Sequence, residues 1–295
     1  MRTLRDAADF DEIATQYDAT REPLEGSALE TIATTLRDWG VRSVLEVGVG
    51  TGRVAAPLAA LGLEVTGVDA SRGMLARARA KKVARLVRGT AYRLPFGDRT
   101  FDVGFFVHVL HLLEDPAGAI GEACRVGRLG AVALVRPPGS GPADGTEEWS
   151  ARRIVLERLR QEGVTLPDRA RGGPQARERE LLGQFPPQRL AVVSEADVTE
   201  PLADQLAMFE RRASRWTLRI PPETLAKAVA EARELVGDRT HSYHRVRALA
   251  LWERPPRGSP SWGDRPHGTA GPGGPGGANG PGVGARVAGR AGPSP

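Results

Sequence analysis

The sequence predicts an α/β fold: a seven-stranded, mostly parallel sheet with helices on both faces and an antiparallel C-terminal strand. Short apolar runs alternate with stretches of helical periodicity, a pattern typical of βαβ units and a parallel sheet. Three alternating glycines follow the first apolar run, which indicates a sharp turn from a strand into a helix. After five strand–helix steps, the order closes on a strand, a helix and a strand.

The apolar runs are the expected strands. The first five are Ser43–Val47, Glu64–Val68, Ala84–Arg88, Phe101–Val107 and Ala131–Arg136, and the last two are Arg189–Val198 and Val246–Glu253. The expected helices are Ser27–Asp38, Arg53–Ala60, Ser71–Lys82, Ala117–Val126 and Pro222–Val236. Pro57 lies early in the second of these helices, where its missing N–H costs little.

Residues 1–254 are expected to form one domain, which an insertion at 137–187 interrupts. The insertion opens with RPPGSGPADG and continues with two helix-like pieces near Thr146–Glu162 and Ala176–Gly183. Because it follows the fifth strand, it leaves the sheet at the C-terminal edge, where open α/β sheets bind ligands. We therefore expect a substrate cap, and a decorative insertion is the alternative.

Residues 255–295 are dominated by glycine and proline. Such a stretch buries too little apolar surface to offset its ordering entropy, which predicts a disordered tail. The tail also accounts for most of the charge. The chain carries +5 with an isoelectric point of about 9.9, and residues 254–295 contribute a net +4. The remaining +1 does not favour a nucleic-acid substrate.

Several classes of protein are disfavoured by the rest of the chain. No apolar run approaches the roughly 18 residues of a membrane span, and the polar N-terminus MRTLRDAADFDE resembles no export or transit signal. A single cysteine, Cys124, excludes an internal disulfide framework and a cysteine-built zinc site. His241 and His244 have a metal-like spacing, but no nearby carboxylate completes a site, so we expect a loop there. The expected localisation is cytoplasmic, and no metal is expected.

The stretch VLEVGVGTGR, residues 44–53, indicates the ligand site. Gly48, Gly50 and Gly52 would admit a ligand close to the backbone, and the helix that follows offers free N–H groups. A dinucleotide loop has the spacing G-x-G-x-x-G, which this stretch lacks. Asp69 follows the loop at about twenty residues, a spacing suited to binding a ribose diol. Together with Glu46, these residues indicate an adenosine derivative.

Five motifs resemble, in order, those of class I S-adenosylmethionine (SAM)-dependent methyltransferases, of the branch that includes ubiquinone and menaquinone biosynthesis enzymes. They are FDEIATQYDATR (10–21), LEVGVGTGR (45–53), VDASRGMLARAR (68–79), RGTAYRLPFGDRTFDVGFFVHVLHLLEDP (88–116) and EACRVGR (122–128). The resemblance covers residues 10–136. It implies a Rossmann-like fold, SAM as the cofactor and methyl transfer as the activity.

The resemblance also implies cofactor contacts. Glu46, Gly48, Gly50 and Gly52 match the loop that cradles the methionine part of SAM, and Asp69 matches the acid that binds both ribose hydroxyls. The remaining expected contacts are Ala70, Met74, Thr90 and Ala91 near the adenine, Val107 beside the methyl donor, and Tyr17 and Arg21 from the N-terminal segment. The family often has aspartate where this chain has Thr90, so that contact is expected to be weaker or made by the backbone.

Two histidines in VHVLHLL are the candidate catalytic residues. Methyl transfer from a sulfonium depends mostly on alignment, and a base is needed only if the nucleophile must lose a proton. His108 and His111 are close enough in sequence to share one helical face. His111 matches a position where this branch commonly has histidine, and a structural role in the turn is its alternative. Arg215 and Trp216 are candidates for substrate recognition, with packing as the alternative.

The expected function is transfer of a methyl group from SAM to O, N or C of a small molecule. An RNA methyltransferase and a non-catalytic SAM-binding regulator remain as alternatives, because the cofactor motifs would look the same. An NAD-linked oxidoreductase is disfavoured by the glycine spacing and by the absence of a Tyr-x-x-x-Lys motif. The sequence does not indicate an oligomeric state.

Overall fold

The computed structural model describes residues 10–137, 140, 150–166, 177–212 and 215–254, apart from residues 16 and 22. The expected tail at 255–295 and part of the expected cap therefore lie outside the described residues. Within the described ranges, every helix is too short or too polar to span a bilayer.

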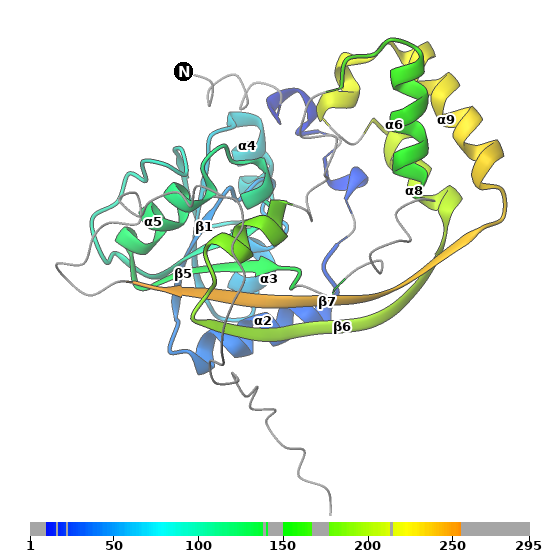
Figure 1. The fold of residues 1–295 in the computed structure, drawn as a ribbon. Helices are drawn as coiled ribbons and strands as arrows, with labels where there is room; N and C mark the ends of the chain where they lie inside the picture. The colour runs from blue at the N-terminus through cyan, green and yellow to red at the C-terminus, as the bar shows by residue number, and fades with distance from the viewer. Residues whose placement is uncertain are drawn as a thin grey trace, which may run out of the picture. The chain divides into compact units, whose positions relative to one another are not determined.

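The described residues form a seven-stranded sheet with the order β3-β2-β1-β4-β5-β7-β6 (Figure 1). Its strands are β1 (Ser43–Val47), β2 (Glu64–Asp69), β3 (Arg85–Arg88), β4 (Phe101–Val107), β5 (Gly127–Val135), β6 (Arg189–Pro201) and β7 (Thr240–Glu253). Strands β1 to β5 are parallel, and β7 is antiparallel to both of its neighbours. The expected fold class is confirmed.

Helices cover both faces of the sheet. The helices are α2 (Gly26–Asp38), α3 (Ala55–Ala60), α4 (Arg72–Ala80), α5 (Pro116–Val126), α6 (Ala151–Gln161), α8 (Leu202–Glu210) and α9 (Pro222–Val236), with short 3₁₀ turns η1 (Asp18–Thr20), η2 (Leu110–Leu112) and η4 (Arg215–Arg219). On one face α2, α3 and α4 share a hydrophobic core with residues of β1 and β4, and on the other face α5 does so. Because both faces are covered, every residue of β4 is buried.

Two helices near the ligand edge, α4 and α5, begin at side-chain caps, whereas α3 begins without one. Ser71 accepts a hydrogen bond from the N–H of Met74 at 3.0 Å, which starts α4 directly after β2. Asp115 caps α5 in the same way, with Pro116 as the first helical residue. These two caps fix where the loops after β2 and β4 end.

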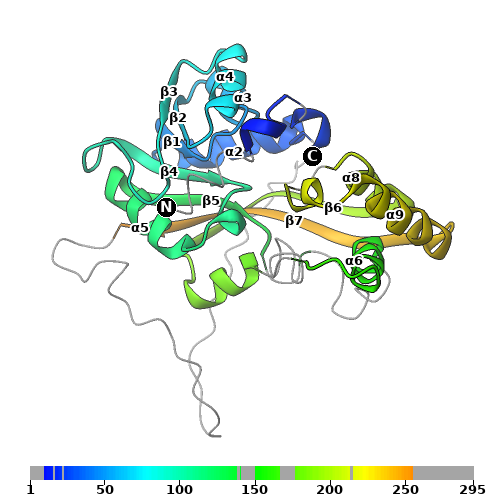
Figure 2. The ribbon, with the colours of Figure 1, turned by 90° about the horizontal axis from the view of Figure 1, so that it is seen from above.

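Strands β6 and β7 are longer than the sequence pattern predicts and continue past the end of β5 as a two-stranded ribbon (Figure 1). Of β7, only the stretch Ala248–Glu253 pairs with β5. By contrast, β6 pairs with β7 along its whole length from Thr240 onwards. The ribbon leads into α8 and returns from α9, and these helices pack with α6 around Leu159, Leu206 and Phe209 (Figure 2). We refer to α6, α8 and α9 as the helical cluster.

The expected cap at 137–187 is therefore divided between two places. Its helix α6 belongs to the helical cluster, where Val155 and Leu159 are buried. A further helix at 177–184 instead packs against the main core through Leu181 and Leu182. The helical cluster also draws on α8 and α9, which come later in the sequence. A cap over the site thus remains a prediction. The helical cluster extends beyond residue 187, because α8 and α9 belong to it.

Candidate functional site

A cavity opens at the C-terminal edge of the sheet, between the loops that follow β1, β2, β3 and β4. The loops after β1 and β2 contribute Gly48, Gly50 and Asp69, and the N-terminal segment contributes Phe10 and Tyr17. The remaining lining residues are Val47, Val68, Ala70, Met74, Gly89, Thr90, Ala91, Tyr92, Val107, His108, Val109, Leu112, Leu113 and Glu114. Such an edge is where parallel sheets bind ligands.

The three glycines of the first loop have positive φ angles but different surroundings. A Cβ on Gly50 would meet nothing closer than 4.0 Å, and a Cβ on Gly48 would clash with Val109. Gly50 thus offers bare backbone to the cavity. A Cβ on Gly52 would meet Val83 at 2.9 Å and the Cα of Ala78 at 3.2 Å, and Gly52 does not line the cavity. Gly52 serves the packing of the loop against α4.

Asp69 ends β2 and holds two loops together. One carboxylate oxygen accepts the N–H of Gly50 at 2.8 Å, and the other accepts the N–H of Ser71 at 2.9 Å. Burial raises the pKa of Asp69, whereas these hydrogen bonds favour the ionised form. Each oxygen keeps lone-pair capacity for a further donor. A vicinal diol in the cavity could supply such donors.

Glu46 is a buried carboxyl in β1, only 2% exposed. Its pKa is raised to about 8 by burial and by the nearby charge of Asp69, against a hydrogen bond from the N–H of Ala55. Within the described residues, its Oε2 atom has no hydrogen-bond partner. Glu46 is not among the residues that line the cavity. An unpaired buried acceptor next to a bare backbone loop suits a ligand that brings a donor or a positive charge.

The loops after β2 and β3 form the expected adenine side. Ala70, Met74, Thr90 and Ala91 all line the cavity, as the resemblance implies. Tyr92 also lines it, although the sequence analysis did not select this residue. Its hydroxyl accepts the N–H groups of Glu114 and Asp115 at 2.9 and 3.3 Å, which ties the loop after β3 to the start of α5. Tyr92 directly follows the predicted residues Thr90 and Ala91. This position next to them is the feature of the sequence that could have identified it.

The N-terminal segment reaches the cavity through two aromatic residues. Tyr17 was predicted and lines the cavity, and Phe10 was not selected. Their rings meet edge to face, with centroids 6.3 Å apart. Arg21 lies over the Tyr17 ring, with its guanidinium carbon 4.8 Å from the centroid, and does not line the cavity. Arg21 is therefore placed to support Tyr17 rather than to contact a ligand directly.

Polar contacts attach the N-terminal segment to the loops around the cavity. Asp11 accepts hydrogen bonds from the Ser71 hydroxyl and from the N–H of Gly73, at the start of α4. Asp18 accepts from the Lys81 ammonium and from the hydroxyl of Thr51, in the glycine loop. The pKa of both aspartates is held below the usual range, because these partners stabilise the carboxylate. The N-terminal segment thus contacts the glycine loop and α4 together.

The two histidines occupy different positions. His108 follows β4, lines the cavity and has a φ of +54°, which is uncommon for a residue other than glycine. His108 as a whole residue is exposed, yet desolvation of its imidazole by the surrounding protein and nearby positive charges, led by Arg136, lower its pKa to about 4. At neutral pH, His108 is therefore uncharged and can accept a proton.

His111 does not line the cavity. It lies in the short turn η2, whereas His108 precedes that turn, so the two do not share a helical face as predicted. Burial and nearby arginines, led by Arg177, lower the pKa of His111 to about 4. Its carbonyl accepts a hydrogen bond from Arg177 at 2.8 Å, and its Nδ1 atom is buried without a partner in the described part of the chain. The geometry favours the structural interpretation of this residue.

Cys124, His241 and His244 do not line the cavity. Cys124 is buried in α5, and its thiol faces the carbonyl of Trp252 at 3.5 Å. His241 and His244 lie in β7, so the expected loop was wrong. Carboxylates do flank His244, since Asp197 and Glu195 contact its two ring nitrogens at 2.8 and 2.9 Å. The side chains of residues 215 and 216 lie outside the described residues.

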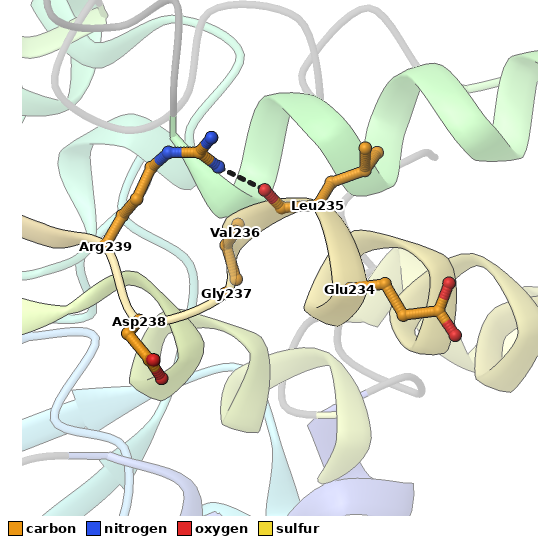
Figure 3. A pocket seen from close by; sticks show the side chains of 6 residues that line it. All are labelled: Glu234, Leu235, Val236, Gly237, Asp238 and Arg239. Atoms are coloured by element: carbon orange, nitrogen blue, oxygen red, sulfur yellow. Dashed lines mark hydrogen bonds between the residues drawn. The ribbon is translucent and has the colours of Figure 1, made fainter.

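The turn between α9 and β7 forms a second hollow (Figure 3). Consecutive residues, 234–239, line it, and the Arg239 guanidinium donates to the carbonyl of Leu235. This hollow is confined to one turn, and the cavity beside the glycine loop is the stronger candidate for a site.

A family model described as a methyltransferase domain matches residues 45–135. The chain is 32% identical over 134 residues to the demethylmenaquinone methyltransferase of Renibacterium salmoninarum, an alignment that covers 44% of this chain and 56% of that protein. A Mycobacterium tuberculosis protein named as an uncharacterized methyltransferase is 30% identical over 227 residues, which cover 72% of this chain and 76% of that protein.

The extent of these alignments differs. The chain spans about half the length of the first curated relatives it matches, 56%, 48% and 52% of each. Among solved structures, the YcgJ protein of Bacillus subtilis aligns with a TM-score of 0.48 at 19% identity, covering 77% of this chain and 99% of that chain. The alignment with the mycobacterial protein covers 72% of this chain, so it extends beyond residues 45–135 and includes part of the helical cluster.

Proposed function

Because the chain belongs to the class I SAM-dependent methyltransferases, of the ubiquinone and menaquinone biosynthesis-like branch, we propose that it transfers a methyl group from SAM to a small molecule. One observation carries the proposal. The glycine loop, Asp69 and the N-terminal aromatic residues line a single cavity together with His108. A cofactor cradle and a group able to accept a proton therefore share one space.

The residues present fit SAM by their chemistry. Gly50 gives open backbone that a ligand can approach, and the partnerless oxygen of Glu46 suits the ammonium group of the methionine part. Asp69 suits the ribose hydroxyls, because its oxygens already accept two N–H bonds and keep capacity for more. Met74 and Ala91 suit the flat adenine. These assignments support the cofactor-binding roles of the predicted residues.

The residues of the chain contribute mainly alignment to the reaction. When bound, SAM would supply an activated methyl carbon for attack by the acceptor's lone pair, and the electron pair of the broken carbon–sulfur bond would remain on sulfur. The loops around the cavity would hold the two reactants in line and keep water out, which accounts for much of the acceleration in such reactions. Phe10 and Tyr17 would provide part of this enclosure.

We infer that His108, rather than His111, takes a proton from the acceptor where one must be lost. His108 lines the cavity and is uncharged at neutral pH, because its pKa is about 4 in the free protein. A base of this pKa is weak, so it would serve an acceptor that becomes acidic as the new bond forms. His111 would act by positioning, through the Arg177 contact to its carbonyl.

A small acceptor is favoured by the enclosure of the cavity. The N-terminal segment is attached at Asp11 and Asp18, and Leu218 of η4 packs against Ile13, Ala14 and Met74. The N-terminal segment, α4 and η4 thus meet beside the cavity. A nucleic-acid duplex would have less access to such a cavity than to an open groove. Several relatives carry the name demethylmenaquinone methyltransferase, which also favours a small acceptor.

Transfer of radiolabel from methyl-labelled SAM tests the proposal. The full chain is incubated in parallel with small cell metabolites and with total RNA, and the label in each is counted. We expect label in the small-molecule fraction, and a loss of it with His108→Asn but not with the remote control Cys124→Ala. Label found only in RNA would contradict a small acceptor. Tight SAM binding with no label in either fraction would indicate a non-catalytic regulator instead.

A further inference from the structure

Tyr92 connects the adenine side of the cavity with the loop that follows β4. It belongs to the loop after β3 and lines the cavity together with its neighbours Thr90 and Ala91. Its hydroxyl oxygen accepts the N–H groups of Glu114 and Asp115 at 2.9 and 3.3 Å. These two bonds use the acceptor capacity of the hydroxyl oxygen. Tyr92 therefore contacts both the ligand space and the backbone at the end of the next loop.

Residues 108–115, which we call the β4 loop, would lie beside the methyl donor. The loop begins directly after the buried strand β4 and ends at Asp115, whose carboxylate caps α5 by accepting the N–H of Gly118 at 2.8 Å. Both ends of the loop thus join regular elements. The residues of the loop that line the cavity are His108, Val109, Leu112, Leu113 and Glu114.

Three attachments hold the β4 loop to other parts of the described chain. Leu110 is buried in the core that α5 shares with the sheet. The carbonyl of His111 accepts a hydrogen bond from Arg177 at 2.8 Å. The third attachment is the pair of bonds to the Tyr92 hydroxyl. Of these three, the Tyr92 attachment is the one that comes from a residue lining the cavity, so it is the one that a ligand can influence directly.

The rest of the loop after β3 is fixed on α5. Glu122 accepts the N–H of Leu94 at 2.8 Å, and Arg125 donates to the carbonyls of Leu94 and Phe96 at 3.2 and 2.9 Å. A ligand that packs beside Tyr92 would therefore restrict its ring without moving α5. Because the hydroxyl is rigidly joined to the ring, the same restriction would reach the backbone of Glu114.

We propose that Tyr92 is a positioning residue, which holds the β4 loop in the arrangement for methyl transfer once the adenine of the cofactor lies beside its ring. This inference rests on the proposed methyl transfer at the same cavity. Cofactor binding would thus place His108 and the apolar residues Leu112 and Leu113 before the acceptor arrives. Because alignment accounts for much of the acceleration in such a reaction, a loosened loop would lower the rate even with the cofactor bound.

Ligands of different length test the proposal. Tyr92→Phe removes the hydroxyl and keeps the ring, and Tyr243→Phe is the matched control, because Tyr243 lies in β7 and does not line the cavity. Thermal melting shows whether both variants are folded. In Tyr92→Phe, adenosine should bind within about twofold of the wild type, whereas S-adenosylhomocysteine, which also reaches the β4 loop, should bind roughly threefold to tenfold more weakly. An equal loss for both ligands, or no loss for either, would contradict the positioning role.

Hydrogen–deuterium exchange measures the coupling between the two loops. Adenosine should slow the exchange of residues 108–113 in the wild type and in Tyr243→Phe, and should leave it unchanged in Tyr92→Phe. Protection of residues 48–52 by adenosine in all three proteins shows that the ligand is bound. Residues 114 and 115 are left out of the comparison, because their N–H groups lose an acceptor in Tyr92→Phe whatever its role. Equal protection of residues 108–113 in Tyr92→Phe and the wild type would overturn the proposal.

A turnover measurement separates this inference from the proposed function. With saturating methyl-labelled SAM and small cell metabolites as acceptors, Tyr92→Phe should transfer label at least roughly threefold more slowly than the wild type. An unchanged rate at saturating SAM would contradict the positioning role. If S-adenosylhomocysteine fails to bind the wild type, the proposed function fails, whereas normal binding and turnover in Tyr92→Phe count against this inference alone.

Discussion

At the residue scale, Glu46 and Gly50 have arrangements that are unfavourable for the free protein and that the proposed SAM binding would explain. Glu46 is a buried carboxyl with a partnerless oxygen, and Gly50 adopts a left-handed conformation beside open space. Neither arrangement stabilises the fold. Both become favourable once a ligand supplies a donor to the carboxyl and fills the space above the glycine.

The Glu46→Gln variant should gain stability as it loses cofactor affinity. The pKa of Glu46 is raised from 4.5 to about 8 in the folded protein, so the folded state holds a proton that the unfolded state releases. Its contribution to stability is therefore present below about pH 4.5 and declines as the pH rises towards 8. Glutamine removes this decline.

Thermal melts at about pH 5 and about pH 9 check the prediction, with SAM affinity measured by calorimetry. The melting temperature of Glu46→Gln should rise relative to the wild type between these values, while SAM binds more weakly. A constant difference in melting temperature across this range would show that Glu46 titrates normally.

Two glycine substitutions should separate binding from packing. Gly50→Ala places a methyl group in open space, at a cost of about 1 kcal/mol for the left-handed backbone, and should weaken SAM binding. In Gly52→Ala the added methyl group would clash with Val83 and crowd the backbone of Ala78. The unfolding free energy should therefore fall by about 3 kcal/mol. Urea melts and calorimetry give both quantities. Equal stability losses in the two variants would contradict the different surroundings.

Sequence reasoning identified single residues wherever the backbone itself determines the role. Gly48 and Gly50 were predicted because a sharp strand-to-helix turn favours glycine, and Asp69 because an acid about twenty residues beyond such a loop suits a ribose diol. Gly52 was grouped with them, but only the packed structure shows that it faces α4. Phe10 and Tyr92 were not selected, because their roles depend on contacts between segments distant in sequence. His108 was named, although its advantage over His111 follows from the cavity alone.

At the scale of elements, the N-terminal segment is the part most directly coupled to cofactor exchange. Asp18 accepts hydrogen bonds from Lys81, at the C-terminal end of α4, and from Thr51 of the glycine loop, and Phe10 and Tyr17 of the same segment line the cavity. Release of the cofactor would require this segment to loosen. The Asp18–Lys81 contact should therefore affect the rate of release more than the stability of the fold.

The Lys81→Gln variant tests this coupling. Loss of a partly exposed ion pair is worth about 1 kcal/mol, so S-adenosylhomocysteine should dissociate roughly threefold to tenfold faster. Lys82→Gln is the matched control, because Lys82 is the adjacent exposed lysine. Stopped-flow displacement measures both rates. Identical dissociation rates in the two variants would show that the contact does not restrain the segment.

β1 to β4 were predicted to within a residue at either end, because buried strands are continuous apolar runs, whereas β5 begins at Gly127 rather than at the predicted Ala131. β7 was predicted to start at Val246, but it begins at Thr240. Its first residues, THSYHR, are polar, since they pair with β6 in a ribbon that extends beyond the central sheet. The division of the insertion between two cores was also not predictable, because it depends on where Leu159 and Leu182 find partners.

At the scale of the whole chain, we expect the tail to be dispensable for the fold and for cofactor binding. Residues 255–295 lie outside the described residues, so the composition alone supports this prediction. Deletion of residues 256–295 should leave the melting temperature and the SAM affinity unchanged within error. A large loss of either quantity would mean that the tail contributes to the domain.

The described chain has one cavity beside the glycine loop, at the C-terminal edge of the parallel strands. The loops after β1 to β4 line it together with the N-terminal segment, and β7 pairs antiparallel with β5 in the same sheet. The antiparallel β7 thus links the cofactor half of the sequence with its C-terminal part. The central claim is that this edge binds SAM.

Calorimetric titration of the full chain with SAM, with NAD as the comparison, tests that claim most directly. SAM should bind at one site per chain, and NAD should not bind. Asp69→Ala removes a charged acceptor worth about 1.5–3 kcal/mol and should weaken SAM binding roughly tenfold to hundredfold. NAD binding without SAM binding, or SAM affinity unchanged in Asp69→Ala, would contradict the account.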